Sequence, residues 1–238
     1  MIARSRLKLH VISAGAAQSV VQQLAAELAA QGGTEVVASF GAVGAQKQRV
    51  LDAATVDIVV LTQAMIEDLI VSGHVLPGSR MDLGPVCGGI AIPAGRARPD
   101  VSTSEALAAT LAVATAVYIP DPAIATAGMQ FVSMCGKLGV LDGVAPKLRT
   151  FPNGYTAMTE MANVGAEGVI GCTQITEIKL VRGVELVAPL PKPLQVATVY
   201  SLGISTRARA LELAREFAAK LAGPAAAARL AAAGFGMT

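Results

Sequence analysis

The stretch 36–62, VVASFGAVGAQKQRVLDAATVDIVVLT, predicts a strand, a glycine turn, a helix and a second strand. Its first residues are β-branched and apolar, as a buried strand requires. Gly41 and Gly44 interrupt that strand, a helix is expected from Ala45, and the run DIVVL predicts the second strand. The turn therefore lies at the carboxyl end of a strand and the amino end of a helix. Unpaired backbone N–H groups and the helix dipole favour an anion at such a position.

The same pattern recurs, because strands alternate with helices along nearly the whole chain. This alternation predicts an α/β fold with a mostly parallel sheet and helices on both faces. Glycine turns are expected at 13–16, 41–44, 125–128 and 153–156, and a polar turn without glycine at 172–174. One interpretation is that the glycines only allow helices to pack on strands. The other is that the turns bind a ligand at one sheet edge. Under that interpretation the predicted ligand-binding residues are Ser13, Ala14, Gly15, Ala16, Gly41, Ala42, Val43, Gly44, Thr62, Thr126, Ala127, Asn153, Gly154, Thr156, Cys172, Thr173 and Gln174.

Three connecting segments carry further expectations. The run 83–93, with its glycine pair, is expected to be a single crossing strand. A helix is expected over 129–138, and a long amphipathic helix over 206–221.

Composition limits the class of protein. The 238 residues suit one large or two small domains. Mean hydropathy is high at +0.55, but no uninterrupted apolar run reaches the ~18 residues of a transmembrane helix, so no membrane insertion is predicted. The net charge of +2, without a basic run, and an aromatic content of 3% argue against nucleic-acid binding.

The cysteines and histidines form no metal-binding pattern. Cys87, Cys135 and Cys172 are an odd number without metal-ligand spacing, and His10 and His74 are the only histidines. We therefore predict neither a metal nor a cofactor.

The amino-terminal residues 1–10, MIARSRLKLH, carry charges but are not followed by an apolar core of a secretory signal. This predicts a cytoplasmic protein. A periplasmic location is the alternative, if the chain is a processed mature form.

Several segments, in this order and spacing, resemble the periplasmic molybdate-binding protein family, which has the type II solute-binding fold. They are ISAGAA at 12–17, SFGAVG at 39–44, VDIVVLT at 56–62, MIEDLIVSGH at 65–74, PGSR at 77–80, IPDP at 119–122, VYSLG at 199–203 and GF at 234–235. The resemblance covers almost the whole chain. Aconitate isomerase is an enzyme similar to the same family.

The resemblance implies two α/β lobes with mixed, mostly parallel sheets flanked by helices and joined by a two-strand hinge. Lobe 1 would comprise 1–84 and 195–238, and lobe 2 would comprise 85–194. A small anion would bind in the cleft between the lobes, which close over it by hinge motion.

This chain also departs from the family pattern. Molybdate binders use serine hydroxyls in the first two turns, whereas the matching positions here are Ala16 and Val43 or Gly44. The tyrosine of the last turn corresponds to Cys172 or Thr173. Side-chain donors are concentrated in the second lobe, at Thr126, Asn153, Thr156, Thr173 and Gln174. We therefore expect an organic carboxylate rather than molybdate.

Two functions remain open at this point. The favoured one is a solute-binding protein for a small anionic ligand, and a homodimer is left open. The alternative is an isomerase that shifts a proton in a tricarboxylate, as the resemblance to aconitate isomerase implies. Cys172 and Glu177 are then the candidate acid–base groups, since a thiolate is favoured at a helix amino terminus. Otherwise Cys172 is a buried small residue and Glu177 a first-turn carboxylate that complements the helix dipole.

Overall fold

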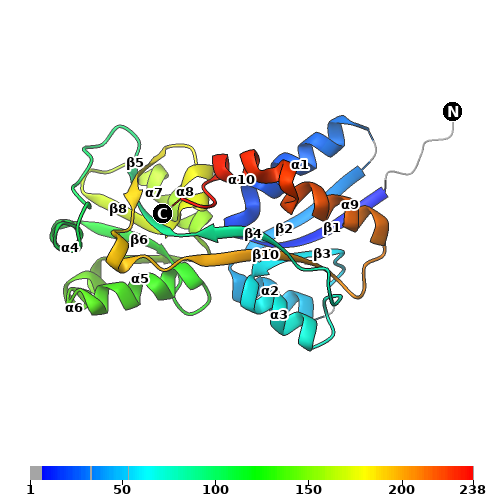
Figure 1. The fold of residues 1–238 in the computed structure, drawn as a ribbon. Coiled ribbons are helices and arrows are strands. Elements are labelled where there is room, and N and C mark those ends of the chain that lie inside the picture. Colours follow the sequence, from blue (N-terminus) through cyan, green and yellow to red (C-terminus); the bar gives the residue numbers. More distant parts are fainter. Residues whose placement is uncertain (1–6, 33, 53, 238) are drawn as a thin grey trace. The chain divides into compact units, whose positions relative to one another are not determined.

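The computed structural model describes residues 7–32, 34–52 and 54–237, and these form two compact units (Figure 1). The first unit contains the chain up to Gly84 and the segment Val199–Ala232. The second contains Pro85–Thr198 and the carboxyl-terminal residues from Ala233 onward. Each unit has its own five-stranded sheet. The predicted α/β class, with mixed, mostly parallel sheets flanked by helices, is confirmed.

The sheet of the first unit has the strand order β2-β1-β3-β10-β4. Its strands are β1 (Leu7–Ala14), β2 (Thr34–Gly41), β3 (Ile58–Thr62), β4 (Met81–Val86) and β10 (Thr198–Ile204). Strands β2, β1 and β3 are parallel, and β10 runs antiparallel to β3. The parallel strands end at Ala14, Gly41 and Thr62, so the turns that follow them lie at one edge of the sheet.

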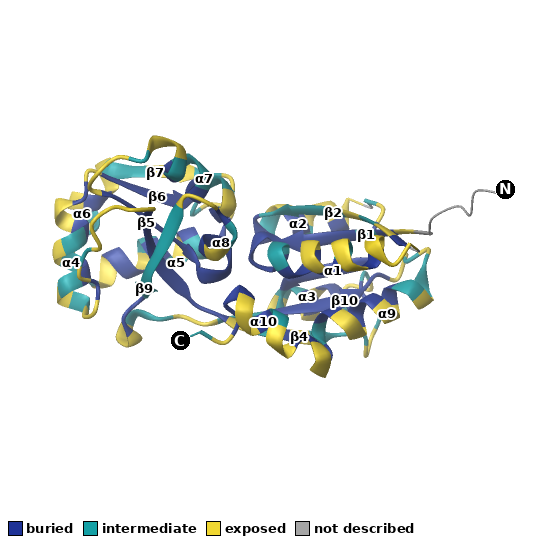
Figure 2. Cartoon of the chain, turned by 90° about the horizontal axis from the view of Figure 1, so that it is seen from above, coloured by how far each residue is buried: buried dark blue, intermediate teal, exposed yellow. Residues whose placement is uncertain are grey.

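The helices of this unit either follow those strands or belong to the segment Val199–Ala232, in which the chain returns to this unit. They are α1 (Gln18–Ala30), reached through the 3₁₀ turn Gly15–Ala17, α2 (Val43–Leu51), α3 (Gln63–Val71), α9 (Leu211–Ala222) and α10 (Ala227–Ala233). The inner strands β3 and β10 are mostly apolar and buried, the edge strands β2 and β4 are partly exposed, and α1 has an exposed outer face (Figure 2). This burial pattern is expected of a sheet that is covered by amphipathic helices.

The sheet of the second unit has the order β7-β6-β8-β5-β9. Its strands are β5 (Gly88–Pro93), β6 (Ala116–Pro120), β7 (Leu148–Phe151), β8 (Val169–Gln174) and β9 (Val184–Pro189). Strands β7, β6 and β8 are parallel, and β5 is antiparallel to both β8 and β9. The carboxyl ends of β6, β7 and β8 therefore lie at one edge, beside the start of β5.

Helices cover both faces of this second sheet. They are α4 (Ser104–Val113), α5 (Thr126–Lys137), α6 (Leu141–Val144), α7 (Gly154–Val164) and α8 (Ile175–Leu180). Figure 1 shows α5 and α6 on one side of the sheet and α7 and α8 on the other. One core cluster joins Ile170 and Cys172 of β8 to Phe131 and Met134 of α5. A second cluster contains Met158 of α7 and packs on the opposite face.

Three connecting segments differ from the sequence prediction. Residues 83–93 form two strands rather than one, because β4 and β5 belong to different sheets and are separated at Cys87. Helix α5 begins at Thr126, three residues earlier than expected. Helix α9 begins at Leu211 instead of residue 206, because the buried Asp57 carboxylate accepts hydrogen bonds from the backbone N–H groups of residues 209 and 210.

The carboxyl-terminal residues belong to the second unit, although the sequence places them with the first lobe. The backbone N–H of Gly236 donates to the carbonyl of Pro85, and Gly234 lies against Ile175 and Lys179. At the other terminus, Met1–Arg6 of the charged segment used to predict location lie outside the described residues. Among the helices that are described, none is both long enough and apolar enough to cross a membrane.

Candidate functional site

In the first unit, two helices begin at the predicted ligand edge without a side-chain cap. The residues that precede the 3₁₀ turn, α1 and α2 are Ala14, Ala17 and Ala42, and alanine has no side-chain oxygen to accept a hydrogen bond. The first backbone N–H groups of a helix have no partner within the helix. Before α1 these groups belong to the 3₁₀ turn, because the N–H of Gln18, the first residue of α1, already donates to the carbonyl of Gly15. The N–H groups at the start of the 3₁₀ turn and of α2, with the positive end of the helix dipole, are therefore open to an anion.

The polar side chains predicted at this edge are engaged with their own backbone. The Ser13 hydroxyl donates to the carbonyl of Ala14 at 2.9 Å. The Thr62 hydroxyl accepts from the N–H of Met65 at 3.4 Å and thereby caps α3. The structure therefore gives Thr62 a capping role that the sequence analysis did not assign.

Two polar side chains of the first unit escaped the sequence analysis. Gln46 is buried in α2 and covers Gly41, where an added Cβ would lie 2.6 Å from the Gln46 Nε2 atom. The position of Gln46 on the apolar face of the helix, with Val43 and Val50, could have indicated this burial. Ser19, in the first turn of α1, has a buried hydroxyl oxygen with no partner among the described residues.

In the second unit, α5 also begins without a cap. It is preceded by Ala125, and its first residue is Thr126. Within the described chain, no side chain accepts a hydrogen bond from the N–H groups of residues 126–128. Gly128 is required because an added Cβ would collide with the carbonyl oxygen of Pro120. The sheet strand and the helix start are therefore held close together, with the N–H groups left open.

Helix α7 begins differently, because its amino terminus is satisfied from within the unit. The Asn153 Oδ1 atom accepts from the N–H of Thr156 at 2.8 Å and from its hydroxyl at 3.0 Å. The Glu177 carboxylate accepts from the N–H groups of Gly154 and Tyr155. Glu177 thus lies where the sequence analysis expected a ligand anion, and Asn153, Gly154 and Thr156 contact protein groups instead.

Glu177 is a buried carboxyl group, with 6% of its surface exposed. Burial raises its pKa, and hydrogen bonds from the Thr173 hydroxyl and three backbone N–H groups oppose that shift. The Thr173 Oγ1 atom lies 2.6 Å from Glu177 Oε2. An added Cβ on Gly154 would collide with both side chains, so this glycine is required for the contact. The four residues 153, 154, 173 and 177 form a structural cluster that fixes the start of α7.

Cys172 does not lie at a helix amino terminus. It lies inside β8, is 2% exposed and packs in the core with Phe131 and Cys135. Burial, and to a lesser extent the neighbouring Cys135 thiol, raises the pKa of Cys172. The expectation of a favoured thiolate is therefore wrong, and the buried interpretation agrees with the structure.

Gln174 is the last residue of β8. Among the predicted site residues, its surroundings say most about ligand binding. It is 1% exposed, and neither its Oε1 nor its Nε2 atom has a hydrogen-bond partner in the described part of the chain. Side chains alternate along a strand. Ile170 and Cys172 pack toward α5, and Thr173 contacts Glu177 on the other face, so the Gln174 side chain belongs to the α5 face. Its amide and the open start of α5 therefore share one face and one edge of the sheet.

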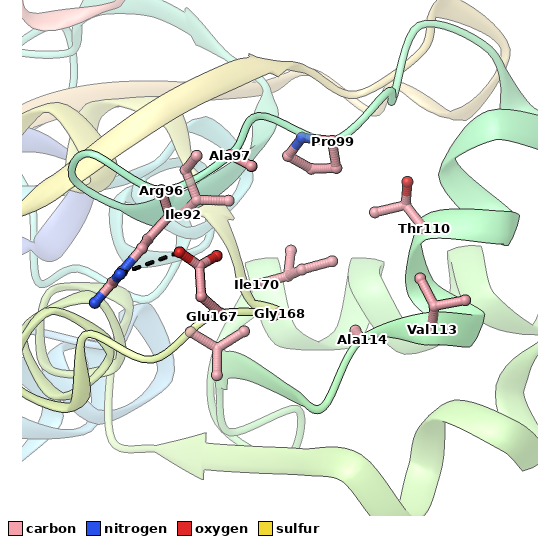
Figure 3. Close-up of a pocket in the computed structure, with 11 residues that line it drawn as sticks. Ile92, Arg96, Ala97, Pro99, Thr110, Val113, Ala114, Glu167, Gly168 and Ile170 are labelled. Carbon is pink, nitrogen blue, oxygen red and sulfur yellow. Dashed lines mark hydrogen bonds and ion pairs between the residues drawn. The ribbon is translucent and has the colours of Figure 1, made fainter.

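A small hollow elsewhere in this unit does not suit an anion (Figure 3). It lies near the amino end of β8, beside Gly168 and Val169, and is therefore distant in the strand from Gln174. Its lining is mainly apolar, and its one cation, Arg96, is paired with Glu167 at 3.1 Å. Across the residues that the structure describes, no three His, Cys, Asp or Glu side chains gather to hold a metal ion.

Comparisons with known proteins identify similar chains. A family model described as bacterial extracellular solute-binding protein matches residues 9–236. Aconitate isomerase from a Pseudomonas species is 29% identical over 165 residues, which cover 67% of this chain and 59% of that protein. The matched part thus spans less than two thirds of that relative.

Solved structures share the fold over nearly the whole chain. The periplasmic molybdate-binding protein of Azotobacter vinelandii has a TM-score of 0.77 at 23% identity, covering 97% of this chain and 99% of that one. The sulfate-binding protein SubI of Mycobacterium tuberculosis H37Rv has a TM-score of 0.72 at 15% identity, covering 98% and 88%. At these identities the similarity establishes the fold alone.

Proposed function

We propose that this chain, which belongs to the family of bacterial extracellular solute-binding proteins, binds a small organic anion at open helix starts. The observation that carries this proposal is the contrast among helix starts at the two sheet edges. The 3₁₀ turn before α1, and helices α2 and α5, begin after alanine, whereas α3 and α7 are capped by Thr62 and Asn153. Open N–H groups at a helix start bind negative charge, and small neighbouring side chains let a ligand approach the backbone.

The donors at these starts favour a carboxylate over a tetrahedral oxyanion. In the first unit, the Ser13 and Thr62 hydroxyls are used within the protein. Four oxygens of molybdate or sulfate would then depend mainly on backbone N–H groups. A carboxylate presents two acceptor oxygens and requires fewer donors. This argument from donor number supports an organic ligand.

The family description also bears on location. An extracellular solute-binding family favours export, and it gives no support to the cytoplasmic location predicted from the amino-terminal segment. We propose a periplasmic location. Anion binding at these helix starts requires no second copy of the chain.

Thermal unfolding in the presence of single anions tests the proposal. Molybdate, sulfate, phosphate, succinate, malate, citrate and tricarballylate are compared at equal ionic strength. A ligand at a hundredfold excess over Kd stabilises the folded state by about 2.7 kcal/mol. We expect stabilisation by one or more carboxylates, followed by a Kd from calorimetry. Stabilisation by molybdate alone would refute the carboxylate assignment.

The similarity to aconitate isomerase favours a second candidate, proton-shift isomerisation of a tricarboxylate. The surroundings of the two candidate acid–base groups give it little support, because Cys172 is buried in the core and Glu177 is hydrogen-bonded to the start of α7. Proton NMR of bound carboxylates in deuterated water decides between the candidates. Deuterium uptake or a new isomer identifies an enzyme, and unchanged spectra with tight binding identify a binding protein.

A further inference from the structure

The Gln174 amide is a buried polar group for which the second unit supplies no partner. Both of its polar atoms are unpartnered among the described residues, although native proteins pair nearly all such atoms. Its neighbour across the sheet is Gly88, which has no side chain, and the space above Gly88 borders on Leu190. The Gln195 amide is already used, since it donates to the Leu190 carbonyl at 2.7 Å. Gln174 is therefore suited to a partner from outside the chain.

The open start of α5 supplies the second half of a ligand site. This helix has 12 residues, so its dipole is developed, and its first N–H groups face the same sheet edge as Gln174. The side chain of Gln174 belongs to the sheet face that α5 covers. A ligand carboxylate bound at the α5 start would thus place its neighbouring atoms on the side of the Gln174 amide.

The Gln174 amide can discriminate between ligands, because it presents one hydrogen-bond acceptor and one hydrogen-bond donor group. A carboxylate or a deprotonated tetrahedral oxyanion offers acceptors only, so it can pair with Nε2 but leaves Oε1 buried and unpaired. A hydroxyl group can donate to Oε1. An ammonium group could also donate, but the positive end of the α5 dipole disfavours a cation.

We infer that Gln174 is a specificity-determining residue and that the ligand is a hydroxycarboxylate. Its carboxylate binds the N–H groups at the start of α5, and its hydroxyl donates to Gln174 Oε1. This inference rests on the proposed anion-binding function and names the class of ligand for that site.

The test compares ligands that differ by one hydroxyl group: malate with succinate, and citrate with tricarballylate. Calorimetry gives the Kd of each for the wild type and for Gln174→Met, which keeps the length of the side chain but removes both polar atoms. Gln195→Met is the matched control, because it removes an amide of the same unit that is bonded within the protein. We expect the wild type and the control to prefer the hydroxylated member of a pair by about tenfold, the effect of roughly one added hydrogen bond.

In Gln174→Met we expect that preference to fall below about twofold, while the Kd of the ligand without the hydroxyl changes less than about threefold. The thermal midpoint of the unliganded variant should equal or exceed that of the wild type, because an unpaired buried amide is removed; Gln174→Leu serves if the Met variant does not fold. Carboxylate binding without a hydroxyl preference, or a preference retained in the variant, overturns the role of Gln174. Absence of binding by every carboxylate overturns the proposed function itself.

Discussion

Replacing Thr126 by aspartate puts a negative charge where the ligand carboxylate is proposed to bind. Thr126 is the first residue of α5 and is only partly buried, so the aspartate side chain can be accommodated. An acidic residue in the first turn complements the helix dipole and stabilises a protein by about 0.3–1 kcal/mol. The Thr126→Asp variant should therefore be at least as stable as the wild type.

The same charge should strongly weaken binding. For the estimate, the new carboxylate is placed roughly 4 Å from a ligand carboxylate that is hydrogen-bonded to the first N–H groups of α5. At an effective dielectric constant of about 20, two like charges at that distance repel by about 4 kcal/mol. This corresponds to a Kd about a thousandfold higher. Stability and affinity thus change in opposite directions, which a variant that merely damages the fold cannot reproduce.

Urea unfolding measures the stability and calorimetry with a bound carboxylate measures the affinity. Thr126→Asn is the matched control, because it has the same size as aspartate without the charge, and we expect it to lose less than about tenfold in affinity. Ala42→Asp makes the same test at the start of α2 in the first unit. If both aspartate variants fold and bind with the affinity of the wild type, the open helix starts are not the ligand site.

The remaining predictions concern the cluster around Glu177 and the cysteines. Gly154→Ala should destabilise the protein by about 1–3 kcal/mol in urea unfolding, because its Cβ would collide with the Glu177 and Thr173 side chains; Gly136→Ala, with open space around its Cβ, should not destabilise it. Burial raises the pKa of Glu177 above its ordinary 4.5, so the folded state holds this proton more tightly than the unfolded state. The stability from this group is then complete below about pH 4.5 and is lost as pH rises through the folded pKa; Glu177→Gln should remove that loss, and an unchanged pH profile would contradict the assignment. Burial raises the pKa of Cys135 to about 11 and also raises that of Cys172, so neither should react with iodoacetamide at pH 8 until urea unfolds the chain. Labelling of Cys172 in the folded protein, detected by mass spectrometry, would contradict its buried position.

Local patterns in the sequence predict the elements around the site well. The stretch 36–62 contains a strand, a helix and a strand, as expected, because apolar periodicity and glycine act within a few residues. The turn is shorter than expected, since Gly41 ends β2 and α2 begins at Val43 instead of Ala45. The start of α9 was predicted too early because the N–H groups of the two residues before it donate to Asp57, which is remote in sequence. The split of 83–93 into β4 and β5 likewise depends on sheet partners that no local pattern reveals.

Local sequence predicts where a turn lies, but it does not show whether the N–H groups of that turn are free to bind a ligand. The motifs at Gly41 and Gly154 look alike in sequence, since each lies at the junction of a strand and a helix. In the structure, Glu177 from a distant segment satisfies the start of α7, whereas the starts of α2 and α5 receive no such group from the described chain. Whether a turn is open is therefore a tertiary property. It follows from side chains that arrive from elsewhere in the fold.

Open helix starts reduce stability, and this gives their distribution a functional meaning. Alanine in place of serine, aspartate or asparagine at an N-cap costs about 1 kcal/mol. Alanines at the starts of α2 and α5 thus forgo roughly 2 kcal/mol, a substantial part of a net stability of about 5–15 kcal/mol. The chain caps α4 and α7 with Thr103 and Asn153 by single side chains, so caps are readily accommodated in this fold. A bound anion would recover the missing stabilisation at the uncapped starts by accepting from the same N–H groups. Lower stability without ligand and higher stability with it are then consequences of the same two alanines, Ala42 and Ala125.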